Sequence, residues 1–463
     1  MTADADRPRA GLGWALGTGT ILQGLNSSMI AVALVTIGSD LDVSTGVLAW
    51  AVSGLYVAAA VGAPLAGSLA DAFGPRRLFL AGLAVVVVAS VAGSLVRTGG
   101  ALIATRVLLG LGASVHFPAA MAIVRHRSAA TGDNPAPLIG IVSLCGQTTA
   151  ALGPLVGAVI VTLGGWRGIY WVNLPVALVS CLTVLRTVPV DPPVPPRAER
   201  RRPDVGGVLG FVAWLTCLML ALSLAESGGT WWPWAVAGAA LLAVFVGWER
   251  GRTAPFLDVR ELAGNPVLVG VLARAVVTYL AFYTVFYGLP QWAERSGGMS
   301  TLASGTLMVP VFAAGAVATL VAARWGARTD PWRLLAVGAG CFVLGGAVLA
   351  TGFRQEMGLA VAVGGAVLLG LPNGFNNVGN QLVLQNAVEP GRSGAATGMY
   401  RTAQYVGAGL SSIAVTFVMS RSGTDPTGSA AARGLGAVVG SIGVLLLLRA
   451  LTVLLAHHRR RPA

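Results

Sequence analysis

The chain alternates between long apolar stretches and short polar connections over most of its length. Fourteen stretches of about 20 residues are long enough to cross the roughly 30 Å hydrocarbon core of a bilayer as helices. They lie near residues 11–37, 47–70, 78–97, 101–124, 137–162, 168–188, 205–226, 231–248, 267–290, 302–323, 334–353, 358–384, 395–419 and 434–456. The runs are continuous, whereas the strands of a barrel alternate apolar and polar positions. We therefore expect an all-α membrane protein with 14 transmembrane helices.

The composition supports a membrane-embedded chain and excludes several kinds of chemistry. The 463 residues are 55% hydrophobic and 11% charged, whereas soluble domains carry about 25% charged residues. The four cysteines lie in apolar runs without the spacing of metal ligands, and the four histidines are too scattered for a triad or metal site. No glycine-rich phosphate loop is present. We expect no cofactor, no metal, no enzymatic activity and no direct use of ATP.

The arginines set the expected orientation of the chain in the membrane. The formal net charge is +13, and every basic residue is an arginine, a bias typical of a GC-rich bacterial genome. With both termini inside the cell, 21 of the 31 arginines fall in cytoplasmic segments. Because cytoplasmic loops carry such an excess, the pattern predicts cytoplasmic termini and an even number of helices. The arginine excess faces lipid headgroups, so we expect the bilayer, and no nucleic acid, as its partner.

One connector divides the chain. Residues 189–204 combine several prolines with four arginines, which predicts a stiff, charged, cytoplasmic segment. It separates a six-helix half at 1–188 from a region at 189–266 that holds the connector and two extra helices. A second six-helix half follows at 267–463. The sequence GPRRL at 74–78 is echoed by DPWRL at 330–334, in the same relative place of each half, which favours a duplicated origin.

A short motif follows the second apolar stretch, in the sequence GSLADAFGPRR at 67–77. Gly74 and Pro75 predict a tight reversal. Asp71 can accept hydrogen bonds from the N-terminus of a neighbouring helix and pair with arginines. The segment resembles the loop 2–3 signature of the major facilitator superfamily, with Ala72 where a basic residue is usual. The resemblance implies that Asp71, with Arg76 and Arg77, controls a cytoplasmic gate; the alternative is an ordinary positively charged turn.

Two further motifs extend this resemblance. Arg106 lies within an apolar stretch, where burial costs several kcal/mol unless the side chain meets a cavity or partner. In the superfamily the matching arginine is implicated in proton coupling; a snorkelling side chain is the alternative. Small residues around Gly153 and Pro154 resemble the glycine-proline signature of the antiporters, with Thr149 and Ala158 in place of glycines. This implies that Gly153 and Pro154 shape the conformational change at the outer side, and ordinary small-residue packing is the alternative.

The sequence WRGIYWVNLP at 166–175, together with fourteen stretches and two extra central helices, resembles the fourteen-helix drug/proton antiporter branch of this superfamily. The resemblance covers nearly the whole chain. It implies an exporter of drug-like or antibiotic small molecules in the bacterial plasma membrane, driven by proton entry with alternating access. The second hypothesis is an exporter or uncoupled facilitator of an endogenous secondary metabolite. No required protein partner is evident from the sequence.

One position departs from the branch. Asn26 stands where an aspartate, a favoured proton-coupling group, is usual, and an amide cannot titrate. The acidic residues fall in loops or at the ends of the apolar stretches, Glu226 being nearest to an interior. Three explanations stay open: Asp71 or Glu226 carries the proton, His116 titrates instead, or coupling is weak or absent.

Polar and aromatic residues within the apolar stretches are the candidates for a substrate cavity near mid-membrane. They are Gln23, Asn26, Gln147, Tyr279, Tyr283, Tyr287, Asn373, Asn376, Asn377, Asn380, Gln381, Arg401 and Gln404. Amides that faced lipid would lose hydrogen bonds, so we expect this set to point inward. Such a cavity suits a bulky, moderately apolar small molecule. Alternatively, the tyrosines are helix packing and the asparagines hold helices together.

Overall fold

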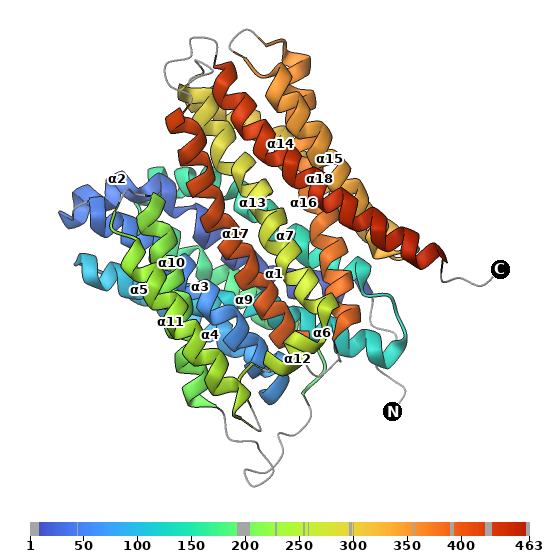
Figure 1. Cartoon of the computed structure of the whole chain (residues 1–463). Helices are drawn as coiled ribbons and strands as arrows, with labels where there is room; N and C mark the ends of the chain where they lie inside the picture. The colour runs from blue at the N-terminus through green and yellow to red at the C-terminus, as the bar shows by residue number, and fades with distance from the viewer. Residues whose placement is uncertain are drawn as a thin grey trace. The chain divides into compact units, whose positions relative to one another are not determined.

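A computed structural model describes residues 9–43, 45–191, 204–226, 229–252, 255–257, 259–295, 299, 301–354, 357–388, 393–421 and 428–459 (Figure 1). These residues form α-helices and short connections, and no strand occurs among them. The expectation of an all-α chain is confirmed for this part of the protein.

The helices follow one another with short connections. They are α1 (Arg9–Ser28), α2 (Ile30–Leu41), α3 (Thr45–Phe73), α4 (Pro75–Ser94), α5 (Gly99–Ser114), α6 (His116–Thr131), α7 (Ala136–Gly164), α8 (Gly168–Trp171), α9 (Asn173–Thr187), α10 (Val205–Glu226), α11 (Trp232–Arg250), α12 (Val259–Gly264), α13 (Pro266–Arg295), α14 (Thr301–Gly326), α15 (Pro331–Gly352), α16 (Leu359–Ala387), α17 (Ser393–Arg421) and α18 (Ser429–Arg459).

Twelve of the described spans are long and apolar enough to cross a membrane. A thirteenth arises if α1 and α2, bent by 56° at their junction, form one span. The sequence treats this region as one apolar stretch at 11–37, and the structure divides it at Met29. The stretch at 137–162 lies in α7, where Ala136–Gly146 forms an apolar helix shorter than a membrane span. The chain is thus an all-helical, multi-span membrane protein, and the count of fourteen stays a prediction.

The chain divides into two compact units. The first unit holds Met1–Leu220, Trp232–Pro266 and Ala387–Thr402. The second holds Ala221–Trp231, Val267–Asn386 and Ala403–Ala463. The division at 188 and 266 that the sequence suggests stays a prediction.

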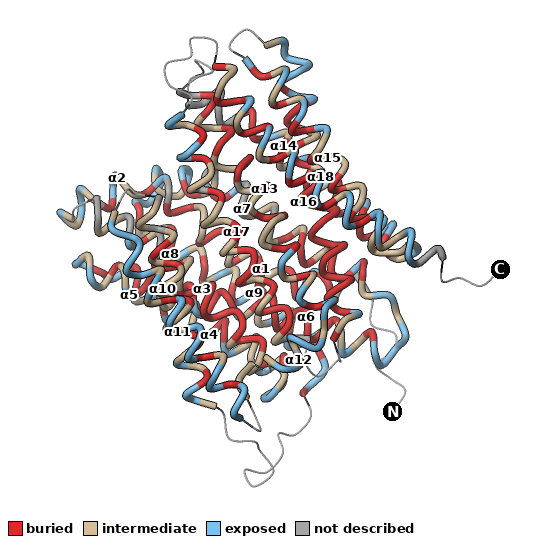
Figure 2. Tube along the Cα trace, viewed as in Figure 1, coloured by how far each residue is buried: buried red, intermediate tan, exposed pale blue. Residues whose placement is uncertain are grey.

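Small residues allow the helices of the first unit to approach closely. A Cβ on Gly17 of α1 would lie 2.5 Å from the sulfur of Cys145 in α7, and one on Gly153 of α7 would lie 1.8 Å from the Ser28 hydroxyl. In the second unit, a Cβ on Gly346 of α15 would lie 2.6 Å from the backbone nitrogen of Gly440 in α18. Since lipid gives little hydrophobic drive for helix association, such backbone contact supplies the packing. Buried and exposed positions alternate around the helices (Figure 2).

Helix α10 begins with a capped turn. The Asp204 carboxylate accepts hydrogen bonds from the Gly207 backbone N–H at 2.9 Å and from the Trp248 indole of α11 at 3.1 Å. Burial raises the pKa of the Asp204 carboxyl, but these hydrogen bonds outweigh it, so that the pKa lies below its ordinary value. Asp204 thereby ties the beginning of α10 to the end of α11.

Candidate functional site

The reversal between α3 and α4 has the geometry that the GPRR motif predicts. Gly74 has φ +100°, a conformation that favours glycine, and Pro75 occupies the first position of α4. The Gly74 N–H donates to the Ala70 carbonyl at 3.0 Å, which closes α3. The turn is therefore a sharp and well-defined connection.

Asp71 binds the beginning of another helix. Its Oδ2 accepts the backbone N–H of Ala395, in the first turn of α17, at 2.9 Å, within the first unit. Unpaired N–H groups at a helix N-terminus favour a negative charge, so this contact stabilises both partners. Arg76 and Arg77 point elsewhere: their guanidinium groups donate to the carbonyls of Leu185 at 3.1 Å and Asp191 at 3.4 Å. The sequence predicts Asp71 and the arginines as one gate but does not identify Asp191.

Asn26 and Arg106, which the sequence assigns to different tasks, lie together in the first unit. Arg106 is 1% exposed. Its Nε donates to the Ala51 carbonyl at 3.2 Å and its Nη2 to the Asn26 carbonyl at 2.9 Å. Among the residues that the structure describes, no carboxylate lies within salt-bridge distance of this guanidinium. Main-chain carbonyl dipoles therefore stabilise the charge of Arg106.

The Asn26 side chain forms a reciprocal pair with Asn173 of α9. The Asn26 Nδ2 donates to the Asn173 Oδ1 at 2.8 Å, and the Asn173 Nδ2 donates back to the Asn26 Oδ1 at 3.0 Å. The Asn26 Nδ2 also donates to the Leu22 carbonyl, and the Asn173 Nδ2 to the Ser90 hydroxyl at 2.9 Å. Asn173 belongs to the motif at 166–175, and the sequence signal that marks it is a lone polar residue in an apolar stretch. The result is a buried, neutral network where the sequence departs from its branch.

His116 begins α6, directly after Val115, where α5 ends. Its ring is fully buried, with Nδ1 3.1 Å from the Ala113 carbonyl. Phe79 contacts the ring edge-on, with centroids 4.8 Å apart. Nε2 has no hydrogen-bond partner in the described part of the chain. His116 is therefore a buried imidazole with one nitrogen unpaired among the described residues.

Several predicted residues are only partly described. The side chains of Gln147, Pro154 and Glu226 lie outside the described residues. Gln23 lies half-buried in α1. The roles expected for Gln23, Gln147, Pro154 and Glu226 therefore stay predictions.

Tyrosines along α13, in the second unit, form the continuous ladder that their spacing predicts. Ring centroids are 6.2 Å apart between Tyr279 and Tyr283 and 5.4 Å apart between Tyr283 and Tyr287, where the rings stack. Phe286 packs edge-on against Tyr287 at 5.2 Å. These contacts give α13 one aromatic face.

Buried amides follow α16 in the same unit. Asn376, Asn377, Asn380 and Gln381 are all buried, and the row continues to Gln385, which the sequence does not single out. Within the described residues, partners are lacking for Oδ1 of Asn376 and Asn377, for Nδ2 of Asn380, and for both amide atoms of Gln381 and Gln385. The row thus offers both hydrogen-bond donors and acceptors.

A buried arginine joins this row. The Nε of Arg274, on α13, donates to the Asn380 Oδ1 at 2.7 Å, and its guanidinium lies 4.3 Å over the Trp332 ring. Arg274 lies within the apolar stretch at 267–290 and is not among the residues that the sequence singles out.

Helix α17 contributes to both units. Arg401 falls in the first unit, with its guanidinium 3.5 Å over the Phe117 ring. Gln404 falls in the second and is buried. The expected cavity residues thus form separate sets in the two units, and their joining in one cavity stays a prediction.

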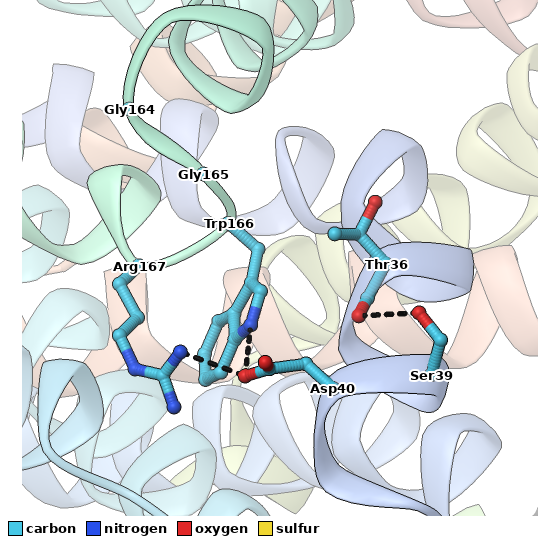
Figure 3. A pocket seen from close by; sticks show the side chains of 7 residues that line it. All are labelled: Thr36, Ser39, Asp40, Gly164, Gly165, Trp166 and Arg167. Atoms are coloured by element: carbon cyan, nitrogen blue, oxygen red, sulfur yellow. Dashed lines mark hydrogen bonds and ion pairs between the residues drawn. The ribbon is translucent and has the colours of Figure 1, made fainter.

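A cavity of about 440 Å³ lies elsewhere in the first unit (Figure 3). It is lined by Thr36, Ser39, Asp40, Gly164, Gly165, Trp166 and Arg167. Asp40 accepts from the Trp166 indole at 3.0 Å and from the Arg167 guanidinium at 2.7 Å. The Trp-Arg pair of the 166–175 motif therefore anchors the end of α2 to the segment after α7. None of the predicted cavity residues lines this space.

Comparison with known proteins decides the family. The model of the Major Facilitator Superfamily matches residues 16–412, most of the chain. The chain belongs to this superfamily. The resemblance drawn from the motifs is confirmed, and the protein is a multi-span membrane transporter of the major facilitator superfamily.

Relatives of this superfamily protein include antibiotic exporters. It is 30% identical to the cephamycin export protein CmcT of Amycolatopsis lactamdurans, over 91% of this chain and 87% of that protein. It is 29% identical to the tetracenomycin C resistance and export protein of Streptomyces glaucescens, over 88% of this chain and 75% of that protein. The crystal structure of the human organic anion transporter MFSD10 covers 96% of this chain and is itself covered completely, with a TM-score of 0.66 at 16% identity. That likeness shows the superfamily fold.

Proposed function

We propose that this transporter exports drug-like or antibiotic small molecules by proton antiport with alternating access. The observation that carries the proposal is the row of buried amides along α16, several of whose atoms lack a hydrogen-bond partner among the described residues, in a chain whose relatives are named for antibiotic export. We propose that the sets in both units form one cavity between two six-helix halves, with α10 and α11 as the extra central helices. The arginine distribution supports cytoplasmic termini in a bacterial plasma membrane.

The α16 amides support a substrate with hydrogen-bonding groups. A buried amide atom without a partner costs about 1–3 kcal/mol, so a row of them in a membrane span favours a functional explanation. Gln381 and Gln385 offer neutral donors and acceptors, which suit carbonyls and hydroxyls. The aromatic face of α13 suits an apolar skeleton. The substrate class is therefore a bulky, moderately apolar compound that carries several polar oxygens or amides.

The contact of Asp71 with α17 supports a gate. In the conformation described, Asp71 holds the first turn of α17 by the hydrogen bond to Ala395. An alternating-access cycle has to break and remake such contacts at one face. Loss of the Asp71 charge should therefore change turnover more than substrate affinity.

His116 is the residue that best supports proton coupling. The Asn26 and Asn173 amides cannot titrate, and their Nδ2 groups already donate hydrogen bonds within the network. Asp71 already accepts a helix N–H. His116 is buried within a membrane span, and its Nε2 lacks a partner in the described part of the chain. We propose that it takes up a proton in one conformation of the transport cycle and releases it in another.

The second candidate, an uncoupled facilitator or exporter of an endogenous metabolite, is favoured by the same amide pair. If no group replaces the missing carboxylate, substrate moves down its own gradient. Substrate-dependent proton movement in the wild type and in His116→Gln separates the two, because a facilitator moves no protons with its substrate in either protein.

Uptake into inside-out membrane vesicles tests the export proposal. Vesicles that contain the protein should accumulate labelled lipophilic antibiotics, and the double variant Gln381→Leu/Gln385→Leu should accumulate several-fold less at equal protein level. Val363→Ala, at an exposed position of the same helix, is the control. Uptake equal to that of protein-free vesicles would refute export, and wild-type uptake in the double variant would make the amide row structural.

A further inference from the structure

The first acidic residue after α9 binds the beginning of α4. Asp191 is 8% exposed. Its Oδ1 accepts the backbone N–H of Arg76 at 3.2 Å, and its Oδ2 accepts that of Arg77 at 2.7 Å. Both oxygens of one carboxylate thus serve the first turn of a helix that lies more than a hundred residues earlier in the chain.

This capping replaces one that α4 cannot provide for itself. The first N–H groups of a helix have no partner within it, and a side chain at the preceding position usually supplies one. Gly74 holds that position before α4 and has no side chain. In the echoed motif of the second unit, Asp330 holds the position before α15, and its own carboxylate accepts the Trp332 N–H at 2.9 Å. The two copies of the motif therefore differ in where the carboxylate comes from.

The shape of Gly74 fits this arrangement. A Cβ at Gly74 would lie 2.5 Å from the Cγ of Asp191, so a side chain there would displace the carboxylate. Two further hydrogen bonds hold the same turn: the Arg77 guanidinium donates to the Asp191 carbonyl, after α9, and that of Arg76 to the Leu185 carbonyl, in the last turn of α9. Four hydrogen bonds in all hold this turn, and those to the carboxylate benefit from its charge.

We propose that Asp191 is a positioning residue of the gate. It fixes the first turn of α4 and, through the Gly74 reversal, the orientation of the Asp71 carboxylate toward the first turn of α17. Asp71 lies three residues before Gly74, and the Gly74 N–H and carbonyl are bonded to Ala70 and Leu78 on either side. A displacement of the first turn of α4 therefore also displaces Asp71, because the backbone from Ala70 to Leu78 is short and hydrogen-bonded at Gly74. The structural link between Asp191 and Asp71 does not depend on the proposed function. Only the expected slowing of transport on loss of Asp191 rests on it.

Hydrogen–deuterium exchange on the full chain in lipid nanodiscs tests this positioning role. In Asp191→Ala, exchange should rise about five- to tenfold at the Arg76 and Arg77 amides, as loss of a helix cap predicts. It should also rise several-fold at the Ala395 amide, which Asp191 does not touch. Asp191→Asn retains one good acceptor and should restore part of the protection at both places.

The matched control is Asp330→Ala, which removes the corresponding cap in the second unit. Exchange should then rise at Trp332 and stay unchanged at Ala395. Asp191→Asn keeps the size of the side chain and leaves the Gly74 reversal untouched, so it serves as the test variant if Asp191→Ala folds poorly. Transport by Asp191→Ala should fall in kcat with little change in KM, and Asp191→Asn should recover part of the loss.

Faster exchange at Arg76 and Arg77 with full protection at Ala395 would overturn the proposal and reduce Asp191 to a local helix cap. Faster exchange at Ala395 in Asp330→Ala would overturn it as well, since the effect would then be a general loosening. A wild-type protein that moves no substrate would refute the proposed function, while the exchange results would still decide the link between Asp191 and Asp71.

Discussion

The reciprocal amide pair of Asn26 and Asn173 can be tested by removing one partner at a time. Asn173→Ala removes three side-chain hydrogen bonds, two to Asn26 and one to Ser90. Interhelical hydrogen bonds in membrane proteins contribute about 0.6 kcal/mol each, so their loss costs about 2 kcal/mol. The Asn26 Oδ1 then lacks a donor in a buried place, which adds about 1 kcal/mol or more. We expect Asn173→Ala to reduce the free energy of unfolding by about 3 kcal/mol.

Two variants calibrate this value. Ser90→Ala removes one of the three bonds and should cost about 0.6 kcal/mol. In a double-mutant cycle, Asn26→Ala and Asn173→Ala should cost less together than the sum of the two single changes, with an interaction energy of about 1–2 kcal/mol. The assay is unfolding of the purified protein in mixed micelles of increasing SDS fraction, followed by tryptophan fluorescence. Additive single effects within about 0.3 kcal/mol would refute the pair.

Four further outcomes are expected. Asp71→Asn should lower the kcat of transport about tenfold with unchanged membrane insertion, because a neutral amide holds the α17 turn less well; equal kcat would remove its gating role. His116→Gln should abolish substrate-dependent proton movement while substrate still moves down its gradient, and retained proton flux would exclude His116. Gln381→Leu alone should raise KM for export about fivefold, measured in vesicles, and an unchanged KM would place the substrate elsewhere. Since the pKa of Asp204 is lowered in the folded protein, ionised Asp204 stabilises the fold above the unfolded pKa of about 4, and this stabilisation is lost as pH falls through the folded pKa. The free energy of unfolding, measured as pH is lowered, should show this loss in the wild type and not in Asp204→Asn.

The spans were predictable because length and continuity of apolar residues decide whether a helix can cross a membrane. The division of the first apolar stretch into two helices at Met29 was not predictable from this pattern. Ser27 and Ser28 each donate a side-chain hydrogen bond to the Gly24 carbonyl one turn back, at 2.9 and 2.8 Å. Such bonds bend helices without any proline, and apolar patterning does not register them.

The local parts of the candidate site were predictable, and its long-range contacts were not. The Gly74 turn and the Tyr279–Tyr283–Tyr287 ladder follow from residue types and spacing within one segment. The partners Asn26 and Asn173 are 147 residues apart, so only the fold brings them together. The same holds for Asp191 and Arg77, which are 114 residues apart.

Proton movement in proteoliposomes tests the central claim most directly. Purified protein would be reconstituted with an internal pH dye, and a panel of lipophilic antibiotics would be added under an imposed pH gradient. The account predicts proton flux that depends on substrate and that is lost in His116→Gln. Substrate movement without proton flux in the wild-type protein would contradict antiport and make the protein a facilitator.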